Sequence, residues 1–574
     1  MYQDDYKRWM EADLEDADLK PELARIEEND EEIKERFAVA LKFGTAGLRG
    51  VLGAGTNRMN IYVVRQATQG LANWVKTQGG TQTVAISYDS RIKSDVFAKT
   101  AAGVLAANGI KVRIYDALMP VPALSFATRY YNCNAGIMVT ASHNPAKYNG
   151  YKAYGPDGCQ MTDDAAAIVY AEIQKTDILT GVKYMPFAEG VEEGLIRFVG
   201  EDCKNALYEA IESRQVRPGL CKTAGLKLVY SPLNGSGLVP VTRVLKDIGI
   251  TDITIVPEQE YPNGYFTTCS YPNPEIFAAL EKGLDLAKET GADLMLATDP
   301  DADRVGAAVK NNEGEWVLLN GNQTALMFVY YLITRWKELG KIKGNEYIVK
   351  TIVSTELIRT IAERNGVELY DVYTGFKWIA AIMKDNEGKK TFIGGGEESY
   401  GFLCEDFVRD KDAVSACTML AETAAWAKDK GLTLYQLLQN IYVEYGFSKE
   451  AGISVVKKGK SGAEEIEAMM KHFRENPLTQ IAGSNVTYVY DYATLKGLSV
   501  AENEKITLDM PTTSNVIQYF TEDNTKVSIR PSGTEPKIKF YCEVHSKVKN
   551  LEELPAAELA AQEKINQIKI SLGI

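Results

Sequence analysis

Histidine is scarce in this chain, because only His143, His472 and His545 occur among its 574 residues. This scarcity excludes any mechanism that needs a cluster of histidines. The eight cysteines include no Cys-x-x-Cys pair, a spacing that zinc sites and redox motifs commonly use. Isolated cysteines in a large acidic chain predict reduced, mostly buried thiols without a disulfide framework.

Long apolar runs are also missing. No stretch reaches the ~18 uninterrupted apolar residues that a membrane span requires. The first residues, MYQDDYKRWMEADLEDADLK, are acidic and contain no apolar core, so they do not have the pattern of a signal peptide. We therefore expect a cytoplasmic protein that does not associate with membranes.

Positive charge is in deficit, with 64 Lys and Arg against 77 Asp and Glu, for a net charge of −13. An acidic surface repels phosphate backbones, which argues against nucleic acid as the main partner. A local basic pocket can still bind a small anionic ligand. The contents of hydrophobic residues (45%) and charged residues (25%) are typical of a globular protein, and the length predicts about four domains.

Strand-like and helix-like patterns alternate along most of the chain. A strand at 83–89, a helix at 94–108 and strands at 110–116 and 135–140 are typical of a mostly parallel sheet covered by helices. Similar strands recur at 226–232, 252–257, 292–297, 346–354, 367–372 and 390–395. The part after about residue 450 follows another pattern, with a charged helix at 462–475 and strands near 485–490 and 526–530. We predict an α/β fold of three successive mixed α/β domains (1–205, 206–322 and 323–448) and a smaller C-terminal α+β domain (449–574).

The last strand of each predicted α/β domain runs into a polar loop. These loops read ASHNP, TDPDADR and GEESYG. Ligands of open α/β sheets bind at the carboxyl ends of the strands. Three such loops facing one another would form a cleft.

TDPDADR has the pattern of a metal site. Asp299, Asp301 and Asp303 alternate with small residues directly after a buried strand, and alternate residues of an extended loop point the same way. Three carboxylates on one side repel one another unless a hard cation lies between them, and Mg²⁺ fits this description. A solvated acidic turn is the alternative. An EF-hand is excluded, because Arg304 and Lys310 occupy the positions where it needs Gly and Glu.

Ser142 follows a strand in TASHNP and lies among hydrogen-bond donors. The loop lacks the Gly-x-Ser-x-Gly pattern of a hydrolase nucleophile, and an ordinary Ser/Asn turn is the alternative. Beside a metal loop, however, a phosphoserine becomes plausible. Lys152, ten residues on, is a candidate for proton transfer if burial or a neighbouring cation depresses its pKa. A surface lysine is the alternative.

Two further loops offer groups for a sugar phosphate. In GEESYG, Glu397 and Ser399 suit a pair of sugar hydroxyls. In RPSGTEPK, a guanidinium, two hydroxyls and backbone N–H groups would cradle a phosphate. Ordinary turns are the alternative for both loops. A fifth loop, FGTAGLRG, contains Arg49 but lacks the nucleotide-binding glycine patterns.

Taken together and in this order, FGTAGLRG, TASHNPAKYNGYK, DPDADR, GEESYG and RPSGTEPK resemble the α-D-phosphohexomutase family, from about residue 43 to about residue 545. The length and the GEES sequence are most similar to the phosphoglucomutase branch of that family. The resemblance implies four domains around a central cleft.

The resemblance also implies roles for individual residues. Ser142 would be the active-site phosphoserine, and it would share the binding of Mg²⁺ with Asp299, Asp301 and Asp303. The groups implied in catalysis near the serine are Lys152, His143 and Arg49. The implied contacts to substrate are Arg304, Thr374, Gly375, Lys377, Glu397, Ser399, Lys411, Arg530, Ser532, Gly533 and Thr534.

The implied activity is the interconversion of α-D-glucose 1-phosphate and glucose 6-phosphate through the phosphoserine. Glucose 1,6-bisphosphate would be both intermediate and activator. Alternatives with the same chemistry are a phosphopentomutase, a phosphomannomutase and a sugar-bisphosphate synthase. A non-catalytic phosphosugar-binding protein is a further alternative. The sequence leaves the choice between monomer and homodimer open.

The chain departs from the family pattern at one position. Some members carry a histidine near the sugar loop, whereas Phe407 stands at about that place here. Lys152 and His143 would then carry the proton transfers. Because the bisphosphate must reorient between the two transfers, the last domain must release it or pivot, and we predict a hinge near residues 445–455.

Overall fold

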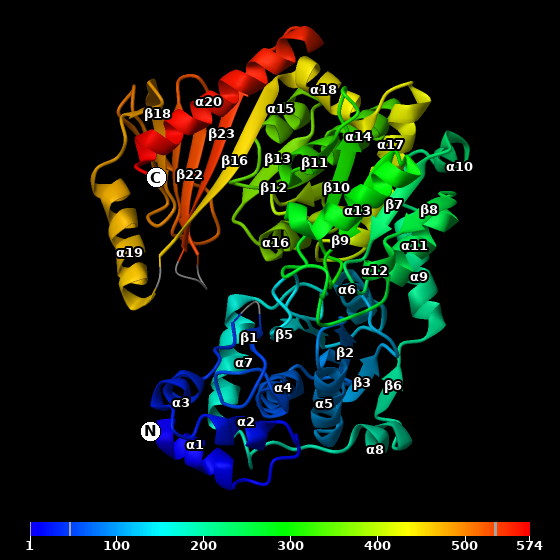
Figure 1. Cartoon of the computed structure of the whole chain (residues 1–574), viewed down its shortest axis with the longest axis vertical. Helices are drawn as coiled ribbons and strands as arrows, with labels where there is room; N and C mark the ends of the chain where they lie inside the picture. Colours follow the sequence, from blue (N-terminus) through cyan, green and yellow to red (C-terminus); the bar gives the residue numbers. More distant parts are fainter. Residues whose placement is uncertain (1, 45–46, 458, 533–536) are drawn as a thin grey trace. The chain divides into compact units, whose positions relative to one another are not determined.

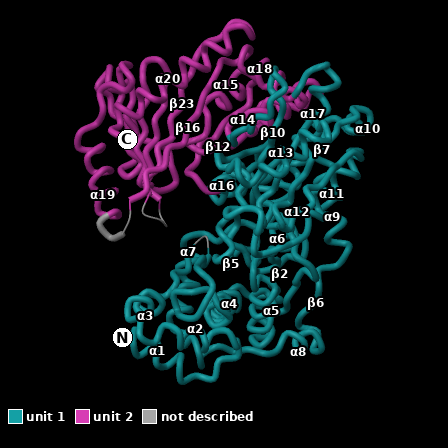
Figure 2. The backbone as a smooth tube through the Cα atoms, in the orientation of Figure 1, with its two compact units in different colours: residues 1–321, 376–433 teal, residues 322–375, 434–574 magenta. Residues whose placement is uncertain are grey.

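The computed structural model describes residues 2–44, 47–457, 459–532 and 537–574. They form two compact units (Figure 2). Unit 1 comprises residues 1–321 and 376–433, and unit 2 comprises residues 322–375 and 434–574. The predicted domain 323–448 therefore contributes to both units, and the predicted domain boundaries stay a prediction.

The first sheet of unit 1 (Figure 1) has parallel strands at its centre and antiparallel strands at one edge. Its order is β1-β5-β4-β2-β3-β6. Strands β4, β2, β3 and β6 pair in parallel, whereas β5 runs antiparallel to both β4 and β1. The bounds are β1 Leu48–Val51, β2 Thr83–Tyr88, β3 Lys111–Ile114, β4 Ala135–Val139, β5 Tyr148–Tyr154 and β6 Ile196–Phe198. The sequence predicts a loop and no strand at FGTAGLRG, but β1 begins inside it.

The helices around this sheet begin and end where their sequences dictate. Helix α4 (Ile61–Lys76) starts at Asn60, whose side chain accepts hydrogen bonds from the N–H groups of Tyr62 and Val63. The alanine-rich α5 (Ser94–Ala107) is almost wholly buried, as predicted for 94–108. Also beside this sheet are α6 Val121–Tyr130, α7 Asp163–Lys175 and α8 Phe187–Glu192, and the chain continues through α9 Glu201–Glu212 and α10 Leu220–Ala224 toward the second sheet.

Three N-terminal helices extend the core of this first sheet. They are α1 Tyr2–Glu11, α2 Leu19–Arg25 and α3 Asp30–Phe37. Trp9 is buried, and its ring lies edge-on to those of Phe37 and Tyr62, at centroid distances of 5.9 and 5.4 Å. Such aromatic pairs add to the apolar area already buried, so the charged N-terminal segment is anchored by its few apolar side chains.

The second sheet of unit 1 repeats this combination of parallel and antiparallel strands, in the order β11-β10-β9-β7-β8. Strands β9, β7 and β8 pair in parallel, and the hairpin β10–β11 adds two antiparallel strands. The bounds are β7 Lys227–Ser231, β8 Asp252–Ile255, β9 Leu294–Thr298, β10 Val305–Lys310, β11 Trp316–Leu319, α11 Leu238–Asp247, α12 Pro257–Glu260 and α13 Phe277–Thr290. The alternation of strand-like and helix-like patterns predicted the parallel strands, and the antiparallel hairpin β10–β11 at the edge makes the sheet mixed.

The second segment of unit 1 supplies α16, an antiparallel strand pair and a buried helix. The bounds are α16 Phe376–Asn386, β14 Thr391–Gly396, β15 Phe402–Cys404 and α17 Ala413–Asp429. Asp412 caps α17 by accepting hydrogen bonds from the N–H groups of Val414 and Ser415. The GEESYG loop lies between β14 and β15, so its position is fixed by two buried strands.

Unit 2 combines a parallel strand pair with an antiparallel sheet. Strand β12 (Glu346–Thr351) pairs in parallel with β13 (Glu368–Val372), and the antiparallel sheet has the order β16-β23-β22-β21-β18-β19-β20. Its strands are β16 Phe447–Val456, β17 Gln480–Ile481 (paired with β18), β18 Ser484–Asp491, β19 Lys496–Ser499, β20 Glu504–Thr507, β21 Ile517–Thr521, β22 Lys526–Pro531 and β23 Lys537–Ser546. The helices are α14 Gly321–Glu338 (its first residue belongs to unit 1), α15 Leu357–Arg364, α18 Leu434–Tyr445, α19 Gly459–Glu475, the short 3-10 helix η1 Leu551–Glu553 and α20 Leu554–Leu572.

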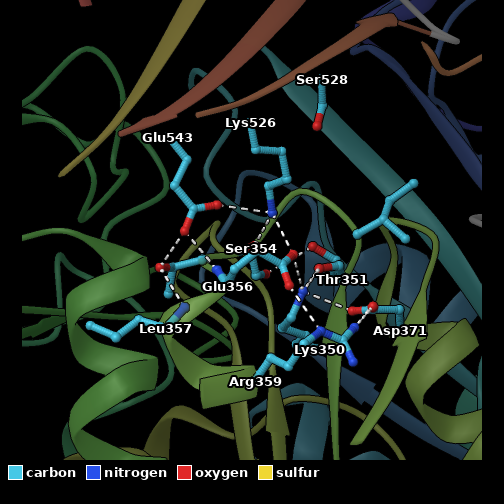
Figure 3. Close-up of polar contacts among 12 residues, drawn as sticks. Lys350, Thr351, Ser354, Glu356, Leu357, Arg359, Asp371, Lys526, Ser528 and Glu543 are labelled. Carbon is cyan, nitrogen blue, oxygen red and sulfur yellow. Dashed lines mark hydrogen bonds and ion pairs between the residues drawn. The ribbon is translucent and has the colours of Figure 1, made fainter. Parts of the chain in front are cut away.

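A buried cluster of charged side chains, which we call the lysine cluster, joins the two parts of unit 2 (Figure 3). Lys526 Nζ lies 2.8 Å from Glu356 Oε1 and 2.9 Å from Glu543 Oε2. Lys350 Nζ lies 2.9 Å from the same Glu356 oxygen and 2.7 Å from Asp371 Oδ1. The lysine cluster comprises Lys350, Glu356, Asp371, Lys526 and Glu543.

The predicted hinge near 445–455 falls next to this cluster. Most of that range is β16, which pairs with β23 along its whole length. Gly446, with φ +110°, is the single residue between α18 and β16. The hinge stays a prediction, and the regular pairing of β16 leaves Gly446 as the position where the backbone can turn most easily.

Two composition-based predictions can be compared with the structure. All eight cysteines are buried and free, which confirms the prediction of reduced, buried thiols. Within the described ranges, no helix combines the length and the apolarity that crossing a membrane demands.

Candidate active site

The three polar loops predicted to face one another meet within unit 1. Ser142, just after β4, donates a hydrogen bond from Oγ to Asp299 Oδ2 at 2.9 Å, just after β9. The backbone N–H of Val305 donates to the carbonyl of Tyr400 in the GEESYG loop at 3.1 Å. Strand ends from three successive parts of the sequence therefore surround one group of carboxylates.

Asp299, Asp301 and Asp303 form that group. All three are buried, with 0–1% of their surface exposed, and one ligand atom from each lies within 4.8 Å of the others. The loop is turned and not extended as the sequence suggested, because Ala302 adopts the left-handed conformation with φ +46°. The N–H groups of Asp303 and Arg304 both donate to Asp299 Oδ1. This turn, and not residue alternation, brings the carboxylates together.

The carboxylate group fits a hard divalent cation. Among the described residues, no hydrogen-bond donor reaches Asp301 Oδ1 or Asp303 Oδ1. Burial and the two neighbouring carboxylates raise the pKa of Asp299 well above its usual range. Unsatisfied buried oxygens of this kind are the ligands that Mg²⁺ prefers, so the residues present suit the metal that the sequence predicts.

Three cations balance these carboxylates. Lys152 Nζ lies 2.8 Å from Asp301 Oδ2, and Lys411 Nζ lies 2.9 Å from Asp303 Oδ2. Burial by itself would lower the pKa of Lys152, but Asp301 and Asp303 outweigh it and raise that pKa. The condition set for proton transfer by Lys152, a depressed pKa, is therefore not met, because its nearest neighbours are anions. The pKa of Lys411 is raised in the same way, because the effect of Asp303 outweighs that of burial.

Arg304 is the third cation. Its Nη1 lies 2.8 Å from Glu275 Oε1, and its Nε lies 3.8 Å from Asp303 Oδ1. Burial would lower the pKa of Arg304, but Glu275 and Asp303 raise it. Glu275 thus holds the guanidinium beside the carboxylate group, in a position to contact a phosphate.

Ser142 has an unusual backbone. Its φ is +52°, a left-handed conformation that costs a residue with a side chain roughly 1 kcal/mol or more. The N–H of Ser142 donates to Thr140 Oγ1 at 2.8 Å, and Thr140 Oγ1 lies 3.1 Å from Asp301 Oδ2. The strained residue is therefore linked to the carboxylate group through Thr140 as well as through its own hydroxyl.

His143 belongs to this serine loop, and Arg49 contacts the loop from β1. His143 Nδ1 is 3.2 Å from Ser142 Oγ. Burial, followed by the charges of Arg304 and Arg49, lowers the pKa of His143 well below its usual range, so the imidazole is neutral near pH 7. Arg49 is exposed on β1 and donates to Asn144 Oδ1 at 3.4 Å. Gly47, with φ +74°, allows β1 to approach β5, because a Cβ there would lie 1.8 Å from the carbonyl oxygen of Tyr151.

The remaining predicted contacts in unit 1 come from the third polar loop and from helix α16. Glu397 is buried and donates its N–H to the carbonyl of Gly401 at 2.8 Å, while Ser399 is half-buried. Lys377 lies in the first turn of α16, 3.3 Å from Asp163 Oδ1. Phe407, expected at about the place where some members of the family carry a histidine, is buried, and its ring centre lies 5.5 Å from the guanidinium carbon of Arg214.

Other predicted residues belong to unit 2. Thr374 and Gly375 end its first segment, and Arg530 lies on β22 and is followed by Ser532. Gly533 and Thr534 lie outside the described residues. The roles implied for all of these site residues stay predictions.

The sequence does not identify four further residues that hold the site together: Asp89, Arg91, Thr140 and Glu275. Asp89 and Arg91 directly follow β2, at the same end of the sheet as Ser142. The strand-end rule that located the other loops applies equally to them. The sequence YDSR therefore already indicated their position at a strand end, but it did not indicate a ligand that they would bind.

Comparison with known proteins agrees with this arrangement. Models of the four phosphoglucomutase/phosphomannomutase domains match residues 40–179 (α/β/α domain I), 206–314 (domain II), 320–445 (domain III) and 486–561 (C-terminal domain). A phosphoglucomutase of Staphylococcus aureus strain MRSA252 is 35% identical over 90% of this chain and 91% of its own. A phosphoglucomutase of Staphylococcus saprophyticus is 34% identical over 92% of this chain and 94% of its own.

Solved structures share the fold. A phosphoglucomutase/phosphomannomutase family protein of Burkholderia thailandensis has a TM-score of 0.66 at 19% identity, covering 92% of this chain and 97% of its own. The open form of parafusin, a phosphoglucomutase from Paramecium, has a TM-score of 0.67 at 17% identity, covering 93% and 97%. The predicted four-domain α/β fold class is thereby confirmed, and the chain belongs to the phosphoglucomutase/phosphomannomutase family.

Proposed function

We propose that this chain is a phosphoglucomutase, which interconverts α-D-glucose 1-phosphate and glucose 6-phosphate. One observation carries the proposal: Ser142 Oγ lies 2.9 Å from Asp299 in a buried group of three carboxylates. The identity of 35% over 90% of the chain with a protein named phosphoglucomutase supports the choice of glucose.

In this proposal Asp299, Asp301 and Asp303, with Ser142, would hold Mg²⁺, which would neutralise charge on the phosphoryl group in transit. The three cations would contribute to the same end. Lys152 and Lys411, kept charged by their carboxylate neighbours, and Arg304, held by Glu275, can stabilise the negative charge that develops during transfer.

The phosphoryl group carried by Ser142 would pass to the free hydroxyl of the hexose phosphate. The glucose 1,6-bisphosphate formed would reorient and return its other phosphate to Ser142. His143 Nδ1 lies 3.2 Å from Ser142 Oγ, and because its imidazole is neutral, it would accept the proton that the attacking hydroxyl releases. Arg49, which donates to Asn144 of the same loop, would position the substrate.

The substrate would be held by the remaining predicted contacts. Glu397 and Ser399 would bind sugar hydroxyls, and Thr374, Gly375 and Lys377 would add further contacts. Arg530, Ser532, Gly533 and Thr534 would clamp the phosphate that is not reacting. Eight buried free thiols are typical of a protein in a reducing compartment, which supports a cytoplasmic location. Whether the enzyme works as a monomer or a homodimer stays open.

The test is a comparison of turnover. Glucose 1-phosphate, mannose 1-phosphate and ribose 1-phosphate are supplied in parallel with Mg²⁺ and a trace of glucose 1,6-bisphosphate. We expect kcat/KM to be at least ~100-fold higher for glucose, which is ~2.7 kcal/mol of transition-state discrimination. A preference for mannose or ribose would keep the phosphoserine chemistry but assign another sugar. No turnover of any of the three would favour a binding protein.

A second experiment isolates the serine. Ser142→Ala is expected to abolish turnover, whereas Ser231→Ala, a buried serine on β7, serves as the matched control with turnover near that of the unaltered protein. Unchanged turnover in Ser142→Ala would refute the phosphoserine mechanism.

A further inference from the structure

One buried guanidinium holds much of the loop that carries Ser142. Arg91 is 3% exposed, and its Nη1 donates to the carbonyls of Pro145 and Tyr148, each at 3.0 Å. Its Nη2 donates to the carbonyls of Ser142 and Asn144. A single side chain thus binds four backbone carbonyls within residues 142–148.

Asp89 fixes the guanidinium and the start of the same loop. Its Oδ2 accepts a hydrogen bond from Thr140 Oγ1 at 2.6 Å and lies 3.5 Å from Arg91 Nε. Its Oδ1 accepts from the N–H of Arg91 at 3.0 Å and from Ser94 Oγ at 2.8 Å. Because Thr140 Oγ1 in turn accepts the N–H of Ser142, Asp89 is linked to the serine through Thr140 as well as through Arg91.

A loop from the second sheet shields this pair from water. The Phe266 ring lies 5.1 Å from Arg91 Cζ. Gly264 packs against the backbone of residues 90–92 so closely that a Cβ would lie 2.4 Å from the nitrogen of Ile92. A buried guanidinium whose two Nη groups both donate to carbonyls has a high cost of rearrangement, so the loop it binds is held in one conformation.

Ser142 needs such support because its left-handed backbone is strained. Relaxation of this residue would move Oγ away from Asp299 and from the phosphoryl path. We propose that Asp89 and Arg91 are positioning residues that hold Ser142 in its reactive conformation. This inference rests on the proposed function and adds that the pair controls the transfer step without touching the substrate.

The proposal predicts a specific kinetic signature. Lysine keeps the charge of arginine but offers three donors at one point in place of a planar fork, so Arg91→Lys cannot bind carbonyls at both ends of the loop. Misplacement by about 1 Å can cost about 100-fold in rate. We expect kcat to fall about 10- to 100-fold while KM changes by less than about threefold, because the substrate contacts are unaltered.

The matched control is Arg65→Lys. Arg65 is also a buried arginine of unit 1, and its two Nη atoms donate to Glu15 at 2.7 and 2.6 Å, away from Ser142. Both variants remove a buried guanidinium, so both are expected to lower Tm. Only Arg91→Lys is expected to lower kcat. Asp89→Asn, which keeps the shape of the side chain, provides a second variant and is expected to lower kcat in the same way.

The experiment measures kcat, KM and Tm for the full-length protein and the three variants, with the phosphorylation of Ser142 followed by intact mass. Normal kcat in both Arg91→Lys and Asp89→Asn would overturn the positioning role, as would a rise in KM at constant kcat. An equal loss of kcat in Arg65→Lys would also overturn it, because the effect would then be general destabilisation. An unaltered protein that shows neither turnover nor phosphoserine would refute the proposed function instead.

Discussion

Lys526→Met removes the central cation of the lysine cluster while nearly preserving side-chain volume. Lys526 is 2% exposed and forms ion pairs with Glu356 and Glu543, and it donates to the carbonyl of Ser354 at 2.7 Å. The substitution leaves Glu543, whose side chain is 4% exposed, without its lysine partner and with His545, 2.8 Å away, as its remaining basic neighbour. Breaking a buried ion pair from one side costs about 3–5 kcal/mol. Glu356, 25% exposed, can recover some hydration, so we expect the lower end of this range.

Thermal unfolding measures the effect. For a unit of this size, 1 kcal/mol corresponds to about 2–4 °C in Tm, so the transition that contains unit 2 should shift down by about 6–12 °C. Lys449→Met is the matched control in the same unit, because Lys449 pairs with Glu558 at the surface, 3.2 Å away. An exposed pair is worth about 0–1 kcal/mol, which predicts a shift of a few degrees at most.

The pH dependence provides an independent check. Burial would raise the pKa of Glu543, but Lys526 and then His545 outweigh it and hold this pKa at about 2, below the usual 4.5. A depressed folded-state pKa stabilises the protein above pH 4.5, and this stabilisation is lost as the pH falls toward 2. The Tm difference between the unaltered protein and Lys526→Met should therefore narrow between pH 7 and about pH 3.5. Equal shifts for the two lysine variants, or a difference that widens in acid, would refute this reasoning.

Three further predictions concern unit 1. Burial raises the pKa of Asp412 to about 6, so its ionisation destabilises the folded state as the pH rises from about 4 to about 6. Asp412→Asn keeps the helix cap, and the Tm of this variant relative to the unaltered protein should rise over that range. A Tm difference that does not depend on pH would contradict the assignment. Chelation with EDTA should abolish turnover and added Mg²⁺ should restore it, with Asp301→Asn needing more Mg²⁺; loss without rescue would argue against the metal site. Asn60→Ala should lower the stability of unit 1 by about 1 kcal/mol, measured as a fall in Tm, and an unchanged Tm would show that the cap of α4 contributes nothing.

Much of the fold could be predicted because the buried strands appear in the sequence as short apolar runs, each followed by a polar loop. The strand predicted at 135–140 is β4 at Ala135–Val139, and the helix predicted at 94–108 is α5 at Ser94–Ala107. The antiparallel edges were harder to predict, since β1 has only four residues and lies in a glycine-rich loop. The division into units could not be predicted either, because Glu356 and Lys526 pair across 170 residues of sequence.

The candidate site was predictable where chemistry is carried by side chains at strand ends. Ser142 and Asp299 were each identified from their own loops, and the structure brings them within 2.9 Å. The function of Arg91 was not visible, because its partners are backbone carbonyls, which every residue possesses. The direction of the Lys152 pKa shift could not be predicted, since the carboxylates that set it come from a loop about 150 residues away.

The separation of charges in the lysine cluster has a consequence for biosynthesis. A ribosome adding about 5–20 residues per second delivers Lys526 roughly 10–30 s after Glu356. Until then the carboxylate of Glu356 has only Lys350 and Arg359 to pair with, and β12 and β13 belong to a unit that lacks its larger sheet. Nascent chains that end before β22 therefore contain an incomplete unit 2. Misassembly or chaperone binding of this unit is possible until about the last fifty residues have emerged.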